Sequence, residues 1–407
     1  MKSRTSSGWR IDTACVHAGE GVDDETRAIR RPIHMANSYE LPTDVEELMK
    51  VFSWDHLDEF HYTREHSATP RCLEQRLAAL EGSEDCVVTA SGMGAVSAAL
   101  FTLLSSGDHL VAAEVCYTGT QKLVSFHLPR FGVDVSLVDT TDLKGVEEAI
   151  RPDTKVVFIE TPGNPLASIS DIQRISQMAH QVGATLIVDS TWSGLVTQSP
   201  LALGADVVIH SATKYINGHG DALGGAILGS RGLLADVREY GVVHLGSCIS
   251  PFNAWLIMRG IVTLPMRMRQ HSESALKVAR FLESHERVVQ VRYPGLASHP
   301  QHEIARQQMR DFSGMMTFSL DCELLENFQF LKRLELITHA VSLGHDQSLI
   351  IYLPTVFFFQ DMVELPEQRK MKYWNLMGDG VFRFSVGIED ADDLIADLAQ
   401  ALDSIGK

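Results

Sequence analysis

The sequence predicts an α/β protein with a large, mostly parallel sheet in one domain and a smaller α+β domain toward the C-terminus. The chain has 407 residues, which is more than one ordinary domain requires. From about residue 70, short apolar runs without polar alternation are separated by helical spacers, the pattern of a parallel sheet covered on both faces. After about residue 250 the order of helices and strands changes, which indicates the second domain.

Composition and charge exclude several function classes. Hydrophobic residues make up 45% and charged residues 21%, as expected for a globular enzyme with a large core. The net charge of −17 argues against a nucleic-acid partner, because such a partner requires a basic surface. The six cysteines contain no CxxC pair, so we expect no metal site and no disulfide framework. With no signal segment and no apolar run of membrane-spanning length, a cytoplasmic protein without a membrane partner is expected.

Residues 1–63 are expected to form an arm that cannot fold alone. Glycines and prolines interrupt it, and it is expected to be extended with short helical pieces, such as residues 44–52. The arm must therefore pack on something else. It leads into Tyr62-Thr63-Arg64, where a hydroxyl and a guanidinium two residues apart point the same way in an extended chain. A surface arginine beside a packed tyrosine remains the alternative.

The large domain is expected to begin with a helix over residues 70–81, a strand over 86–90 and a helix that runs to residue 104. Ser91-Gly92-Met93 occupies the turn before that helix. Such a turn places free N–H groups of a helix N-terminus against an anion, although small residues also serve tight packing alone. Further strands are expected over residues 109–114, 134–138, 155–160, 185–189 and 206–210, with a helix over 171–181. Ligands of parallel sheets bind beyond the carboxyl ends of the strands.

The segment Ser211-Ala212-Thr213-Lys214 organises the rest of the chain. It follows the last of these strands and precedes the glycine-rich residues 215–225, which allow backbone N–H groups to approach phosphate oxygens. This favours Ser211 and Thr213 as phosphate ligands and Lys214 as the amine that forms a Schiff base with pyridoxal 5′-phosphate (PLP). Asp189 closes an apolar strand and would keep the pyridine nitrogen protonated, or alternatively cap the next turn.

The C-terminal domain is expected to start from a helical region over residues 251–286, interrupted near Pro265. Its strands are expected over residues 288–293, 315–320 and 381–386, and its helices over 302–309, 324–335 and 390–405. Arg383 lies in a strand that is otherwise suited to burial. An inward arginine needs an anion, and a substrate carboxylate would pair with it through two hydrogen bonds. The expected division is an arm over residues 1–63, a cofactor domain over 64–258 and a C-terminal domain over 259–407.

Motifs along nearly the whole chain resemble the Cys/Met-metabolism family of PLP-dependent enzymes, which includes cystathionine γ-synthase, cystathionine γ-lyase, methionine γ-lyase and O-acetylhomoserine sulfhydrylase. Their joint order and spacing carry the resemblance. The motifs are Tyr62-Thr63-Arg64, Ser91-Gly92-Met93, Glu160-Thr161-Pro162-Gly163-Asn164-Pro165, Val188-Asp189-Ser190-Thr191, residues 211–219, Tyr293-Pro294-Gly295-Leu296 with Ser298-His299-Pro300, and Arg383-Phe384-Ser385-Val386-Gly387.

The resemblance implies the aspartate-aminotransferase type of fold (fold type I), PLP as cofactor, an amino-acid substrate and a homotetramer of two active dimers. Lys214 would hold the cofactor and shuttle protons, Asp189 would bind the pyridine nitrogen, and Tyr117 would stack on the ring and assist proton transfer. The other implied cofactor ligands are Ser91, Gly92, Met93, Ser211 and Thr213 from one subunit and Tyr62 and Arg64 from its neighbour. The implied substrate-binding residues are Asn164, Ser342 and Arg383.

Two segments depart from the family pattern and bear on the substrate. Many members have Tyr-Gly-Gly or Tyr-Gly-Cys at the stacking tyrosine, whereas this chain has Tyr117-Thr118-Gly119. Methionine γ-lyases carry a functional cysteine two places after that tyrosine, where this chain has Gly119. After Ser342-Leu343-Gly344 the family often continues with a glutamate, whereas this chain reads His345-Asp346-Gln347.

The sequence predicts γ-elimination from a γ-substituted amino acid, with γ-replacement on an activated homoserine as the alternative. Acids near the expected pocket favour a cationic leaving group, such as the guanidinooxy group of canavanine, over the thiomethyl group of methionine. These acids are Asp55, Asp58, Glu59, Glu114 and Asp346. An ordinary solvated surface is the other interpretation of the same acids. An aminotransferase or β-lyase on the same fold and a non-catalytic relative are less favoured.

Overall fold

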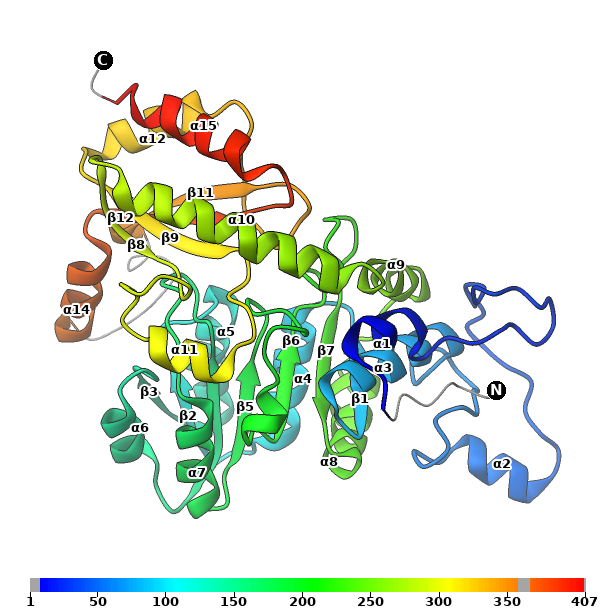
Figure 1. Cartoon of the computed structure of the whole chain (residues 1–407). Coiled ribbons are helices and arrows are strands. Elements are labelled where there is room, and N and C mark those ends of the chain that lie inside the picture. The colour runs from blue at the N-terminus through cyan, green and yellow to red at the C-terminus, as the bar shows by residue number, and fades with distance from the viewer. Residues whose placement is uncertain (1–7, 358–366, 406–407) are drawn as a thin grey trace.

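The computed structural model describes residues 8–357 and 367–405. Figure 1 shows a large domain around one sheet, a smaller C-terminal domain above it, and an N-terminal arm projecting from the side of the large domain. In the part of the chain that is described, no helix has both the length and the apolar composition needed to cross a bilayer.

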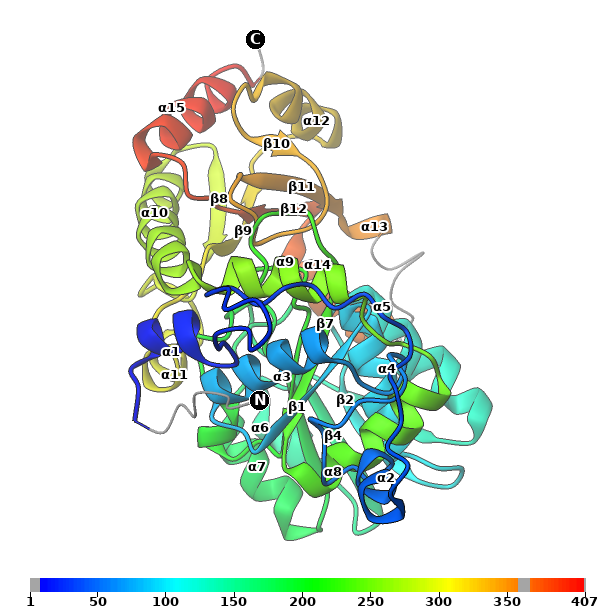
Figure 2. The same cartoon turned by 90° about the vertical axis from the view of Figure 1, so that its right-hand side faces the viewer.

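The N-terminal arm carries two short helices, α1 (Ile11–His17) and α2 (Val45–Val51). The second one confirms the helix predicted there, since Asp44 accepts the N–H groups of Glu46 and Glu47 as its N-cap. Figure 2 shows α1 next to α3 (Ala68–Glu81) on one face of the sheet, whereas α2 lies far along the arm.

A seven-stranded sheet forms the centre of the large domain, in the order β1-β7-β6-β5-β4-β2-β3. Its strands are β1 (Asp85–Thr89), β2 (His109–Ala113), β3 (Asp134–Val138), β4 (Thr154–Glu160), β5 (Thr185–Asp189), β6 (Val207–His210) and β7 (Gly225–Gly229). The strands β2 to β6 are parallel, as predicted, whereas β7 runs antiparallel to both β1 and β6. The strand β7 was not predicted, because a five-residue run with glycine at both ends directly after a glycine-rich segment has the composition of a loop.

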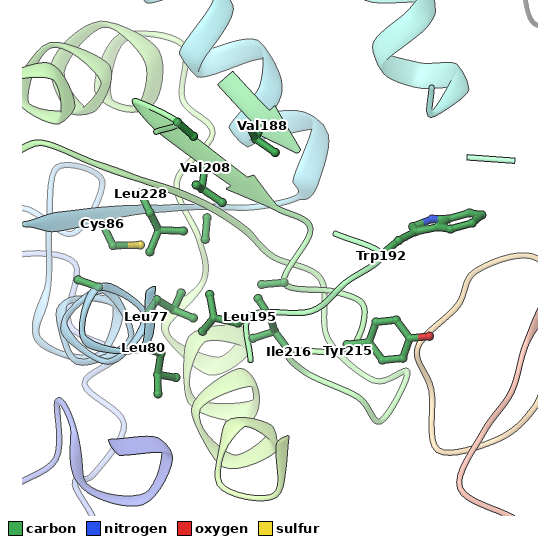
Figure 3. Packing of buried hydrophobic residues seen from close by; sticks show 14 of the residues in the cluster. Leu77, Leu80, Cys86, Val188, Trp192, Leu195, Val208, Tyr215, Ile216 and Leu228 are labelled. Atoms are coloured by element: carbon green, nitrogen blue, oxygen red, sulfur yellow. The ribbon is translucent and has the colours of Figure 1, made fainter. Parts of the chain in front are cut away.

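Helices cover both faces of this sheet. They include α3, α4 (Gly92–Leu103), α5 (Thr118–Lys122), α6 (Leu143–Ala149), α7 (Ile172–Gln181) and α8 (Arg231–Asp236), together with the π-helical turns η1 (Leu123–His127) and η4 (Val237–His244) and the 3₁₀ turns η2 (Leu128–Phe131) and η3 (Pro200–Leu203). Figure 3 shows the packing on one face, where Leu77 of α3 lies below Cys86 of β1, Val208 of β6 and Leu228 of β7. These side chains are almost fully buried, and burial of one leucine side chain contributes roughly 1.5–3 kcal/mol.

The C-terminal domain contains a five-stranded sheet in the order β10-β11-β12-β9-β8. Its strands are β8 (Val288–Arg292), β9 (Met315–Leu320), β10 (Thr338–His339), β11 (Leu349–Pro354) and β12 (Gly380–Ser385). Its helices, with the two that lead into it, are α9 (Pro251–Ile261), α10 (Leu264–Ser284), α11 (His302–Gln308), α12 (Leu324–Arg333), α13 (Thr355–Phe357), α14 (Glu367–Met377) and α15 (Ala391–Leu402). The predicted interruption near Pro265 is present between α9 and α10. The strands β10 and β11, which follow α12, were not predicted from the sequence.

The division of the chain at residues 63 and 258 stays a prediction. Residue 258 lies inside α9, which ends at Ile261, and α10 then packs against β8, β9 and α15 of the C-terminal domain. Tyr215 links the two domains, because its hydroxyl accepts the N–H of Gly314 at 3.1 Å. Figure 3 shows the Tyr215 ring extending away from the sheet. The C-terminal domain is therefore held directly beside the segment that follows β6.

Candidate active site

The carboxyl ends of β4, β5 and β6 form the floor of the candidate site. Glu160 ends β4 and Asp189 ends β5, and the sheet register places these two residues opposite each other. The strand β6 ends at His210, and residues 211–214 follow directly. Because the three strands are parallel neighbours, their carboxyl ends meet at one edge of the sheet.

Lys214 is partly buried in this floor, and its Nζ donates a hydrogen bond to Ser342 Oγ at 2.7 Å. Burial lowers the pKa of Lys214 to about 8, and the positive charge of Arg383 acts in the same direction. Near neutral pH, Lys214 therefore has a larger neutral fraction than an ordinary lysine. A neutral amine acts as a nucleophile or a base, which an ammonium group cannot do.

Asp189 is buried and presents one oxygen for a ligand. Its Oδ1 accepts the backbone N–H of Thr191 at 3.0 Å and the Thr191 hydroxyl at 2.6 Å. Within residues 8–357 and 367–405, no donor is recorded on Oδ2. The bond from the backbone N–H fits the capping role, and the second oxygen is available to a cationic ring nitrogen. Burial raises the pKa of Asp189, so a cation at this place would stabilise its charged form.

Glu160 supports two candidate site residues, a role that the sequence analysis did not assign. Its carboxyl oxygens accept the backbone N–H of Tyr117 at 2.8 Å and that of Asn164 at 2.7 Å. Burial and the neighbouring Asp189 raise the pKa of Glu160 to about 8. Glu160 and Asp189 end neighbouring strands and pair with each other in the sheet register. This pairing would have pointed to Glu160, but it can be recognised only once the register is known.

We expect Glu160→Gln to weaken folding most at low pH. Glutamine has one acceptor oxygen, so one buried N–H loses its partner at a cost of about 1–3 kcal/mol. In the folded wild type the pKa is raised from 4.5 to about 8. The folded state therefore holds this proton longer than the unfolded state, and the contribution of Glu160 to stability falls as the pH rises through that window. Glutamine does not titrate, so the stability of Glu160→Gln does not fall for this reason as the pH rises.

Denaturant unfolding of the cofactor-free chain from pH 5 to pH 8 measures the difference between wild type and Glu160→Gln. The difference in unfolding free energy should shrink as the pH rises. Glu147→Gln, at an exposed position on α6, is the matched control and should show no pH-dependent difference. A difference that is constant over the whole range would contradict the raised pKa of Glu160.

The turn between β1 and α4 forms a cradle for an anion. Ser91 is the N-cap of α4 and accepts the N–H of Gly94 at 3.1 Å, which leaves the first N–H groups of the helix, at Gly92 and Met93, facing outward. A Cβ at Gly92 would lie 2.7 Å from Ser211 Cβ, so only glycine allows this approach. Thr213 is fixed beside them, since its Oγ1 exchanges hydrogen bonds with the backbone of Gly224.

Arg383, Asn164 and Ser342 come together beside Lys214. The Arg383 guanidinium donates to Asn164 Oδ1 at 3.3 Å and to the Ser342 carbonyl oxygen at 3.2 Å. Burial lowers the pKa of Arg383 to about 10. Among the described residues, no carboxylate lies within ion-pair distance of this guanidinium. Two neutral acceptors at long distances leave a buried charge poorly compensated, so the site suits a carboxylate ligand.

Tyr117 lies between these two parts of the site. It precedes α5, and Glu160 holds its backbone N–H. A Cβ at Gly119 would lie 2.7 Å from Tyr117 Cε1 and 3.0 Å from Met93 Sδ, which places the ring next to the anion cradle. Tyr117 is 48% exposed in the single chain, which leaves room for a planar ligand to stack on its ring.

Comparisons with known proteins agree over the full length of the chain. A family model described as Cys/Met metabolism PLP-dependent enzyme matches residues 12–403. This chain belongs to that family. It is 42% identical over 398 residues to canavanine gamma-lyase from Pseudomonas canavaninivorans, covering 97% of this chain and 96% of the relative. It is 38% identical over 395 residues to L-methionine gamma-lyase from Treponema denticola, covering 96% of each.

A solved structure confirms the fold expectation. The crystal structure of cystathionine gamma-lyase from Lactobacillus plantarum, complexed with L-serine, matches with a TM-score of 0.88 at 35% identity and covers 98% of this chain and 99% of that one. The family member described here is therefore a fold type I, PLP-dependent lyase of Cys/Met metabolism.

The residues present fit PLP on observations of this structure alone. The Gly92–Ser211 contact shapes a cradle that a Cβ would fill, beside the N-terminus of α4, where a phosphate belongs. Asp189 Oδ2 has no recognised donor among the described residues and could accept one from a ring nitrogen, and the pKa of Lys214 is lowered to about 8. The site has an anion cradle at the turn before α4 and a carboxylate at the end of β5, and Lys214 follows the neighbouring strand β6. That order matches a ring bearing a phosphate and a basic nitrogen.

Tyr62 and Arg64 are not brought to this site within one chain. Arg64 Nη1 donates to the carbonyl oxygen of Val243 at 2.8 Å, and its guanidinium lies 5.5 Å from the Tyr62 ring centroid. In the described residues, no recorded contact joins either side chain to Lys214. Their expected place in a neighbouring site stays a prediction.

The acids expected around the leaving group do not form one cluster in the single chain. Glu114 is buried and accepts a hydrogen bond from the Tyr373 hydroxyl at 2.7 Å. Asp58 lies on the arm near Arg71 and Gln75, and Asp55 and Glu59 are exposed there. Asp346 belongs to the same loop as Ser342, whose hydroxyl accepts a hydrogen bond from Lys214.

Proposed function

We propose that this protein catalyses γ-elimination from an L-amino acid whose Cγ carries a cationic or donor-rich leaving group, with canavanine as the preferred substrate. The arrangement of Lys214, Ser342 and Arg383 supports the elimination chemistry, because one reactive amine lies beside an arginine that has no carboxylate within ion-pair distance among the described residues. The 42% identity to a canavanine gamma-lyase supports the choice of substrate.

Each residue has a defined task in this proposal. Arg383 and Asn164 bind the substrate carboxylate and so point Cα toward Lys214 Nζ. Bound PLP would supply an electron sink for the charge that develops at Cα. Lys214 Nζ accepts the proton from Cα and later returns a proton to the substrate. Tyr117 covers the open face and excludes water, and its hydroxyl is the second proton carrier.

The proposal includes the assembly and location of the enzyme. We place the protein in the cytoplasm as a homotetramer of two active dimers, with the amino-acid substrate as its small-molecule partner. The phosphate cradle of Ser91, Gly92, Met93, Ser211 and Thr213 is completed by Tyr62 and Arg64 of a second subunit. The arm over residues 1–63 is the part of the chain that reaches across.

Product analysis with a panel of substrates tests the proposed reaction. The purified holoenzyme is incubated with canavanine, methionine, cystathionine and O-acetylhomoserine, each with and without an added thiol. Ammonia and 2-oxobutanoate mark γ-elimination, and homoserine marks hydrolytic loss of the γ-group. A thioether formed only with thiol marks γ-replacement.

We expect canavanine to be used with a kcat/KM at least about tenfold above that of methionine, since a single charge-assisted hydrogen bond to the leaving group is worth roughly 1.5–3 kcal/mol. We also expect the thiol to have no effect on the products. A clear preference for methionine over canavanine would rule out the cationic leaving group, and thioether formation as the main reaction would rule out elimination.

A further inference from the structure

A hydrogen-bonded chain runs from Lys214 into the C-terminal domain. Lys214 Nζ donates to Ser342 Oγ at 2.7 Å, and Ser342 Oγ lies 3.1 Å from His345 Nε2. Lys214 follows β6 of the large domain, whereas Ser342 and His345 belong to the loop between β10 and β11. His345 is one of the positions at which this chain departs from the pattern of its family.

The loop that carries Ser342 and His345 is held in one conformation. Ser342 has a φ of 87°, a left-handed conformation that is unfavourable for serine and persists only where the surroundings impose it. The N–H of Gly344 donates to Ser385 Oγ at 2.9 Å, which ties the loop to the end of β12. Downstream, Ser348 Oγ donates to Glu389 at 2.9 Å. The Ser342 hydroxyl is therefore presented to Lys214 by a rigid support.

The His345 ring lies between the loop and the backbone after Lys214. A Cβ at Gly220 would lie 2.8 Å from His345 Nδ1, so that side of the ring faces the backbone and Nε2 faces Ser342. The charged groups around the ring are Lys214, Asp346 and Asp221. Burial, and then the charge of Lys214, lower the pKa of His345, while the two carboxylates act weakly in the opposite direction. The lowered pKa favours the neutral form of His345 at neutral pH.

The direction of the hydrogen bonds follows from the donors and acceptors present. An ammonium group has three donors and no acceptor, so Ser342 Oγ must accept from charged Lys214. The hydrogen of the Ser342 hydroxyl then needs an acceptor elsewhere, and Nε2 of a neutral His345 is at the right distance. A protonated His345 would instead donate to Ser342 Oγ and bring a second positive charge toward Lys214.

We propose that His345 is a positioning residue for Lys214, and that its neutral ring fixes the Ser342 hydroxyl as the acceptor for Lys214 Nζ. Protonation of His345 reverses this arrangement and makes the charged form of Lys214 less favourable. Because the interaction is reciprocal, the two groups titrate as a pair. The inference rests on the proposed role of Lys214, but it concerns a contact that exists in the protein alone.

Labelling of the Lys214 amine in the cofactor-free full chain tests the proposal without turnover. Short pulses of acetic anhydride between pH 5 and pH 9, followed by peptide mass spectrometry, give the labelling rate of Lys214. Exposed Lys144 in the same samples is the internal reference. For an isolated amine, the logarithm of the rate falls with a slope of one as the pH drops below its pKa.

Below pH 6.5 we expect the labelling rate of Lys214 in wild type to depart from this line and to be about three- to tenfold faster than the line predicts. This factor corresponds to a coupling of about half to one pKa unit between His345 and Lys214. His345→Gln should follow the straight line, because its amide oxygen still accepts from Ser342 but cannot gain a proton. His345→Phe should shift the whole curve toward lower pH, because the Ser342 hydroxyl is then free to donate to the neutral amine.

His339→Gln, at an exposed position on β10, is the matched control and should retain the wild-type curve. Circular dichroism checks that each variant is folded. If wild type and His345→Gln give the same straight line, or if His339→Gln removes the departure, His345 does not position Lys214. This result leaves the proposed reaction untouched, since the substrate panel decides that separately.

Discussion

Lys214→Ala should lose the yellow colour of the lysine-bound cofactor and nearly all turnover. Removal of a general acid–base group alone costs about 10²–10⁴-fold in rate, so we expect a drop of at least about 10³-fold in kcat. The physical reason is that Nζ is an amine with a lowered pKa that Ser342 Oγ holds in place, with the positive charge of Arg383 close by. Absorption spectroscopy of the purified protein and a 2-oxo acid assay measure the two effects.

Lys214→Arg separates charge from reactivity in the same position. It keeps a donor near Ser342 Oγ, but a guanidinium has no neutral form near physiological pH and cannot act as a base. The arginine variant should therefore fold normally and stay as inactive as the alanine variant. Lys144→Ala, on the exposed face of α6, is the control and should retain full activity. Substantial turnover by either Lys214 variant would remove this residue from the mechanism.

The strand ends and their polar residues could be predicted from sequence because they depend on local signals. Short apolar runs mark β4, β5 and β6, and Asp189 and Lys214 stand directly at their ends. The strand β7 could not be predicted in this way, because glycines at its two ends are also typical of turns, although here they allow the strands to pack closely.

Residues that act through contacts distant in sequence could not be found in this way. Glu160 supports Tyr117 across 43 positions, and His345 reaches Lys214 through a loop 128 positions away. Neither distance leaves a periodic pattern in the chain. Such roles follow from sheet register and domain docking, which are properties of the whole fold.

The N-terminal arm exposes apolar and cationic side chains outside the body of the molecule, and no other part of the same chain covers them in the described structure. Ile29, Val45 and Met49 are between 66% and 84% exposed. Figure 1 shows this part of the chain projecting from the large domain. Apolar surface of this kind is normally covered by a partner. A second copy of the chain would cover it and receive Arg64 at its phosphate cradle.

Mixing two inactive variants should therefore restore activity. If Arg64 binds the cofactor phosphate as proposed, Arg64→Ala removes a charge-assisted hydrogen bond worth about 1.5–3 kcal/mol, so at limiting cofactor its sites should be largely empty. Lys214→Ala chains lack the reactive amine. In a mixed dimer, if the arm acts across the interface, both defects fall in one site and the other site is intact. Random reassortment after reversible dissociation should then return about a quarter of wild-type activity, since half of the dimers are mixed and each has one intact site.

The matched control mixes Lys214→Ala with Asp189→Asn. Both residues lie at the strand ends of one chain, so every mixed dimer carries one defect in each site and no activity should return. Chains with tags of different mass establish by native mass spectrometry that the hybrids form. If Arg64→Ala hybrids form and remain as inactive as this control, Arg64 acts within its own chain. In that case the guanidinium must leave the carbonyl oxygen of Val243 and reach the cradle from the same subunit, which would require the arm to fold back over β1 and α4.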